Sequence, residues 1–227
     1  MDQMGINLRA RGLAVVLAPL AFMIVALFSQ GAASADVLCK NSPNKAGECL
    51  QGGIWGSGTN FTLESTNVNF HMPSAWATDI QCGHSNMTIG TTSSGSNTAG
   101  VGVSGKVGSL SFRDCNSNSG INCTIGESSN YKTSITATDT KGSGSMTFQG
   151  PVSFLVSCGF GFYQCPWTLG LSGTALDVVG GNPAVFTANE EPMTVGTGTG
   201  CGVAPTFSGQ YRLTGANTFM WPAYRTI

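Results

Sequence analysis

Charged side chains are scarce in this chain of 227 residues. Asp, Glu, Lys and Arg together make up 9% of it, against about 25% in an average soluble protein, and there is no run of basic residues. The sequence therefore excludes the usual nucleic-acid-binding protein, and any charge attraction to anionic lipid is weak, because both depend on clustered Lys and Arg. Surface polarity must come from Ser, Thr, Asn and Gln.

Residues suited to catalysis are also few. His71 and His84 are the two histidines of the chain, and neither has the spacing of a metal ligand; the chain also has no Cys-x-x-Cys pair and no Gly-x-Ser-x-Gly motif. No sequence motif supports a Ser-His-Asp catalytic triad built from either histidine with Asp79, Asp114 or Asp177. The sequence favours a protein without enzymatic activity, cofactor or metal.

Helical periodicity is missing after the first 35 residues. Short segments of alternating polar and apolar residues recur instead, separated by clusters of Gly, Ser, Asn and Thr. The clearest are 60–66, 107–112, 131–138, 145–148, 152–157 and 210–214. This pattern predicts a single all-β domain of roughly ten to fourteen strands, either an antiparallel β-sandwich or a jelly-roll or barrel-like fold with disulfides.

The N-terminal residues are typical of a secretory signal. Arg9 and Arg11 precede an apolar run at 12–28, and Ala33-Ser34-Ala35 forms a small-x-small cleavage site. We predict a signal peptide at 1–35 and a β domain at 36–227, with no membrane span after cleavage. An uncleaved anchor is the alternative, although the run is short for a spanning helix. The mature chain keeps 8 of the 10 basic and 10 of the 11 acidic residues.

Eight cysteines all lie after the predicted signal. This placement predicts disulfides formed in an oxidising compartment, and so a secreted, extracellular or cell-envelope protein. Proximity in sequence favours three short bridges, and the two cysteines left over would form a long one. The predicted pairs are Cys39–Cys49, Cys115–Cys123, Cys158–Cys165 and Cys82–Cys201.

One segment carries a cluster of aromatic residues. Between Cys158 and Trp167 the chain reads CGFGFYQCPW. A constrained loop that exposes Phe160, Phe162 and Tyr163, with Trp167 just beyond it, would suit stacking on a sugar, contact with a protein or shallow insertion into a lipid interface. The alternative is that these rings fill one end of the core. Exposure of the rings decides between the two.

Several segments resemble small exported proteins of unknown function from actinobacteria and related bacteria. The resemblance rests on the signal, the Cys82 segment, a strand that ends in cysteine (Leu110–Cys115), and the C-terminal run from Cys201 to Thr214. It implies a disulfide-bonded all-β domain and transfers no catalytic residue.

Three functions follow from these observations. The first is a non-enzymatic secreted or envelope β-sandwich that binds a glycan, a cell surface or a protein partner. The second is a secreted hydrolase acting on glycans, which needs a cleft with two carboxylates about 5–10 Å apart. The third is a secreted inhibitor or effector, which needs a protruding disulfide-braced loop with an extended backbone.

Overall fold

Alternating burial runs along the strands as the sequence pattern predicts. In Val152–Cys158 (VSFLVSC), Val152, Phe154 and Val156 are buried and the residues between them face outward, because successive side chains of a strand point to opposite faces. The strands are β1 (Ser34–Cys39), β2 (Asn60–Ser65), β3 (Val68–His71), β4 (Asp79–Thr91), β5 (Val103–Ser117), β6 (Asn122–Ile125), β7 (Tyr131–Ala137), β8 (Ser143–Gln149), β9 (Val152–Cys158), β10 (Tyr163–Leu169), β11 (Ala175–Val179), β12 (Val185–Val195), β13 (Thr206–Thr214) and β14 (Trp221–Thr226).

These fourteen strands come from a computed structural model of the chain. It describes residues 34–45, 48–49, 53–73, 79–95, 102–127, 131–138, 142–169, 175–196, 201 and 204–226. Most of the predicted signal, residues 1–33, lies outside the described residues. Within the described ranges, no helix has the length and hydrophobicity needed to cross a bilayer.

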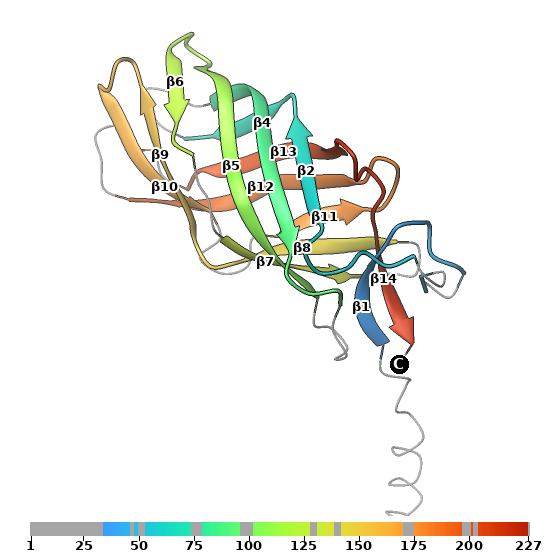
Figure 1. Cartoon of the computed structure of the whole chain (residues 1–227). Coiled ribbons are helices and arrows are strands. Elements are labelled where there is room, and N and C mark those ends of the chain that lie inside the picture. The colour runs from blue at the N-terminus through green and yellow to red at the C-terminus, as the bar shows by residue number, and fades with distance from the viewer. Residues whose placement is uncertain are drawn as a thin grey trace, which may run out of the picture. The chain divides into compact units, whose positions relative to one another are not determined.

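The antiparallel strands pair in two closed circuits that share β4, β5, β12 and β13. The first circuit is completed by β2, β7, β8 and β11. The second is completed by β3, β6, β9 and β10. In Figure 1, β4 and β5 cross in front of β12 and β13. The all-β, sandwich or barrel-like prediction is therefore confirmed.

The space between the two layers is filled by large apolar side chains. Phe70 lies at the centre of an aromatic cluster, with ring centroids 5.2 Å from Phe112, 5.3 Å from Phe207 and 5.4 Å from Trp167. Such pairs prefer edge-on or tilted contacts because of the charge distribution of their rings. Tyr211 is fully buried in the same core.

The eight cysteines form four disulfides, of which only Cys39–Cys49 matches the predicted set. The other three bonds correct it: Cys82–Cys115, Cys123–Cys158 and Cys165–Cys201, with sequence separations of 33, 35 and 36. The cysteines pair in sequence order, the first with the second, the third with the fourth and so on, so the loops that the bonds close do not overlap. These bonds agree with folding in an oxidising compartment.

Strand register explains the difference. Cys82, Cys115, Cys123 and Cys158 lie directly opposite one another in a row across β4, β5, β6 and β9. Cys115 therefore has a cysteine opposite it on each side, and it bonds to Cys82. In the β9–β10 hairpin the residue opposite Cys158 is Tyr163, which leaves Cys165 out of register.

The strands nearest the two ends of the described chain pair with each other. Ser34 lies opposite Thr226 and Cys39 opposite Trp221 in the β1–β14 ribbon. The ribbon contacts β7, β8 and β11 of the first circuit. It therefore lies at the end of the molecule away from β6, β9 and β10 (Figure 1).

The buried carboxyl of Asp36 on β1 should make stability depend on pH. Asp36 is 1% exposed, and burial raises its pKa above 3.8 against an opposing hydrogen bond from the Ala137 backbone. An acid whose pKa is raised by folding loses stability as the pH rises from the unfolded pKa through the folded one. Asp36→Asn is therefore expected to raise the free energy of unfolding at about pH 7 and to leave it unchanged at about pH 3.

Urea denaturation at both pH values measures this effect. Glu64→Gln, at an exposed position on β2, is the matched control and should give the same small change at both. A lower free energy of unfolding for Asp36→Asn near neutral pH would contradict the prediction.

Candidate functional site

The turn that joins β9 to β10 has an unusual backbone. Gly159, Phe160 and Gly161 have φ angles of 62°, 57° and 88°, so three consecutive residues adopt the left-handed region. Glycine adopts this region freely, whereas a bulky residue there is strained. The two glycines therefore permit the turn, and Phe160 is held between them at a cost in backbone energy.

The four aromatic residues predicted to bind differ in their exposure to solvent. Phe160 and Phe162 are 107% and 86% exposed, as open to solvent as in an unfolded peptide. Tyr163 is 8% exposed and Trp167 is 0% exposed, so the prediction that these two rings lie on the contact surface is wrong. The side chains of both residues lie on the inward-facing side of β10, the same face as Cys165. Their rings belong to the core.

The turn between β5 and β6 lies beside the β9–β10 turn. The backbone N–H of Gly159 donates to the carbonyl oxygen of Asn122 at 3.2 Å. The adjacent residues Cys123 and Cys158 form a disulfide that joins the β5–β6 hairpin to the β9–β10 hairpin. This arrangement brings the exposed side chain of Ile121 to the same end of the molecule. We call Ile121 with residues 159–162 the aromatic tip. Sequence reasoning missed Ile121, because nothing local links it to a turn 38 residues away.

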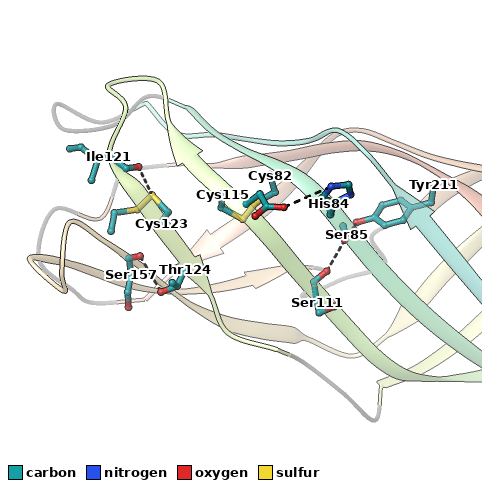
Figure 2. The surroundings of a disulfide bond; sticks show 12 residues. Cys82, His84, Ser85, Ser111, Cys115, Ile121, Cys123, Thr124, Ser157 and Tyr211 are labelled. Atoms are coloured by element: carbon teal, nitrogen blue, oxygen red, sulfur yellow. Dashed lines mark hydrogen bonds and ion pairs between the residues drawn. A yellow bond between two sulfur atoms is a disulfide. The ribbon is translucent and has the colours of Figure 1, made fainter.

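A pocket of about 600 Å³ opens between the two turns. We call it the tip pocket; it is lined by Gly120, Ile121, Asn122, Thr124, Ser157, Gly159, Phe160 and Gly161. Figure 2 shows Thr124 and Ser157 on neighbouring strands, with the Thr124 hydroxyl donating to the Ser157 carbonyl at 3.4 Å. The Cys123–Cys158 bond lies on the opposite, buried side of the same two strands.

The two segments that form the tip contain no charged residue. Residues 115–126 and 155–166 contain no Asp, Glu, Lys or Arg. Phe160, Phe162, Ile121 and Leu155 are the large apolar side chains exposed there. The aromatic tip therefore offers apolar contact and neutral hydrogen-bonding groups, and it has no ionic contact to offer.

A different surface holds both histidines. His71 Nδ1 lies 2.6 Å from Asp79 Oδ1, and His84 Nε2 lies 3.8 Å from Asp114 Oδ2. Asp79 and Asp114 line a polar groove of about 430 Å³ on the outer face of β4 and β5, with Gln81, Asn116 and Asn118. Figure 2 shows His84 and the Cys82–Cys115 bond, and Cys82 is one of the residues that line the groove.

The polar groove does not enclose its carboxylates. The side chains of Asp79 and Asp114 are 35% and 72% exposed, so water reaches both, whereas catalytic carboxylates of glycosidases work in sites shaped around the substrate. Among the described residues, no group of three or more His, Cys, Asp or Glu side chains has the geometry to hold a metal. The groove presents exposed carboxylates and amides.

Behind the groove a buried hydrogen-bond chain ties the layers together. The Tyr211 hydroxyl lies 2.9 Å from Ser85 Oγ, which donates to the carbonyl oxygen of Ser111 at 3.0 Å (Figure 2). Burial raises the pKa of Tyr211 far above its ordinary value, against the opposing effect of its hydrogen bond with Ser85. This tyrosine therefore stays protonated and serves the fold.

Comparison of the chain with protein-family models, curated proteins and solved structures finds no match. The resemblance to exported actinobacterial proteins stays a prediction. Function has to be argued from the geometry of the two surfaces.

Proposed function

We propose that this protein is a non-enzymatic binding protein of the extracellular space or cell envelope and that the aromatic tip is its contact surface. The four disulfides support an oxidising compartment. The tip supplies the contact, because it places two rings in solvent on a turn fixed by a disulfide. Rigid, pre-positioned aromatic residues lose little entropy on binding and are enriched at binding hot spots.

The conformation of Phe160 is the observation that carries this proposal. Its backbone is left-handed and its ring is fully exposed. A left-handed L-residue costs roughly 1–2 kcal/mol, and an exposed ring recovers none of this by packing. Strained residues of this kind gather at functional sites, where a partner recovers the cost.

The position of the tip also suits a contact role. The β9–β10 turn lies at the end of the molecule away from the β1–β14 ribbon (Figure 1). A protein held at its N-terminal strand would present the tip outward. The turn backbone is left-handed instead of extended, so it lacks the extended conformation expected of the inhibitor alternative.

Replacing Phe160 with asparagine should weaken binding strongly without harming the fold. Asparagine tolerates the left-handed region, so Phe160→Asn is expected to raise the free energy of unfolding by about 0.5–1 kcal/mol. The fraction of protein bound should fall at least about tenfold, as for a hot-spot aromatic. Phe162→Ser should weaken binding less. Co-sedimentation with cellulose, chitin, peptidoglycan and phosphatidylcholine vesicles measures binding, and urea denaturation measures stability.

Val179→Thr is the matched control, since Val179 is an exposed apolar residue on β11. It should bind like the wild type. The proposal fails when the Phe160 and Phe162 variants are retained as well as the wild type on every surface that retains it. It also fails when no surface retains the wild type.

A further inference from the structure

The tip pocket has the dimensions of a small-ligand site. Its volume is about 600 Å³, and sites for small molecules span roughly 300–1,000 Å³. Two turns and two paired strands form its walls. The hydrogen bond from Gly159 N–H to the Asn122 carbonyl and the Cys123–Cys158 bond hold these walls together, so the pocket is formed before any ligand arrives.

The lining of the pocket selects for a neutral polar ligand. Asn122 contributes an amide, and Thr124 and Ser157 contribute hydroxyls. Together these groups donate and accept hydrogen bonds without any net charge. None of the lining residues is ionisable, so the pocket has nothing to neutralise a phosphate, a carboxylate or an ammonium group.

Phe160 adds a flat apolar surface at the edge of this polar lining. Its ring is fully exposed, and Phe160 is one of the residues that line the pocket. A sugar ring has hydroxyls around its rim and C–H groups on its faces. It can therefore stack on the ring of Phe160 while its hydroxyls pair with Asn122, Thr124 and Ser157.

Two other occupants fit the observations less well. Inserting the tip into a bilayer would bury the Asn122 amide and the Thr124 hydroxyl where lipid tails offer no hydrogen bonds. Residues 115–126 and 155–166 contain no Lys or Arg to hold an anionic headgroup. A stable protein partner needs about 800 Å² on each side, more than two protruding rings and an isoleucine provide.

We infer that the tip pocket is a binding subsite for a neutral oligosaccharide, with Phe160 as the stacking platform and Asn122, Thr124 and Ser157 as the hydrogen-bonding wall. This inference rests on the proposed contact role of the tip and names its ligand. The shallow, open site predicts weak binding to one chain and stronger retention on a polymer that offers repeated units.

Titration followed by nuclear magnetic resonance tests this assignment. The probes are uncharged hexasaccharides of β-1,4-glucose, β-1,4-N-acetylglucosamine and α-1,4-glucose. An oligogalacturonate hexamer and phosphatidylcholine vesicles serve as the charged and lipid comparisons. The protein is the isotope-labelled mature domain made in a bacterial periplasm, because Asn122-Cys123-Thr124 fits the N-glycosylation pattern. Backbone amide shifts of Gly120, Asn122 and residues 159–161 report occupancy.

Three variants separate the parts of the site. Phe160→Asn should weaken binding of the hexasaccharide at least about tenfold. Thr124→Val keeps the shape and removes the hydroxyl, and should weaken it about fivefold, the value of one hydrogen bond. Asp114→Asn, in the polar groove, should leave the affinity unchanged.

Shift changes confined to the tip residues with a neutral hexasaccharide, and reduced by the first two variants, support the assignment. It is overturned if no neutral hexasaccharide binds, if binding maps to the polar groove, or if the oligogalacturonate binds better. Vesicle binding that depends on Phe160, without sugar binding, also overturns it. In that last outcome the tip keeps its contact role, so the failure of the ligand assignment is distinguishable from failure of the proposed function.

Discussion

Replacing Trp167 with alanine is expected to lower the free energy of unfolding by about 3–5 kcal/mol, the cost of removing a large ring from a packed core. Trp167 is fully buried. Its ring lies 5.4 Å from Phe70 and 6.5 Å from Phe154, measured between centroids. Urea denaturation of the disulfide-intact protein measures the loss. A cost below about 1 kcal/mol would show that Trp167 is not in the core.

Two further variants sharpen this prediction. Trp167→Phe should cost much less, because the indole Nε1 has no hydrogen-bond partner among the described residues and phenylalanine removes that buried donor. Phe162→Ala, at a fully exposed ring five positions away, should change stability by less than about 0.5 kcal/mol. Similar costs for Trp167→Ala and Phe162→Ala would contradict the separation of core and tip.

Removing the Cys123–Cys158 bond is expected to cost about 4 kcal/mol and to disable the tip. The bond closes a loop with a sequence separation of 35, and constraining a loop of that length in the unfolded chain stabilises the fold by about that amount in the loop-entropy model. The variant Cys123→Ala with Cys158→Ala also frees the β5–β6 turn from the β9–β10 turn. Binding at the tip should therefore fall together with stability.

The Cys39–Cys49 bond provides the matched control. Its sequence separation is 10, which gives about 2.5–3 kcal/mol in the same model, and it belongs to the end of the molecule with the β1–β14 ribbon. Removing it should destabilise the protein less and leave binding unchanged under conditions where the protein is folded. Equal loss of binding in both variants would contradict a specific role for Cys123–Cys158 at the tip.

The strands were predictable from sequence because their signal is local. Alternation at 131–138 and 152–157 corresponds to β7 (Tyr131–Ala137) and β9 (Val152–Cys158), since each residue needs only its neighbours to define the inward face. Disulfide pairing is different. Cys82 meets Cys115 because β4 pairs with β5 in one particular register, and register depends on the whole sheet.

The candidate site was predictable in part. Phe160 and Phe162 follow from the glycines around them, because a tight turn leaves their side chains without neighbours. Trp167 could have been assigned to the core from its spacing of two from Cys165, which puts both on one face of a strand. Thr124 and Ser157 could not have been found, because they meet only where β6 pairs with β9.

The pairing of β1 with β14 has a practical consequence for attaching this protein to other molecules. Asp36, the first residue after the predicted signal, lies opposite Tyr224, so a short linker could join the mature chain into a circle and allow new ends to be opened in another loop. A fusion or a solid support fixed beside β14 would lie at the end of the molecule away from the β9–β10 turn (Figure 1). The fold therefore offers a display scaffold, with the attachment point at one end and the presented turn at the other.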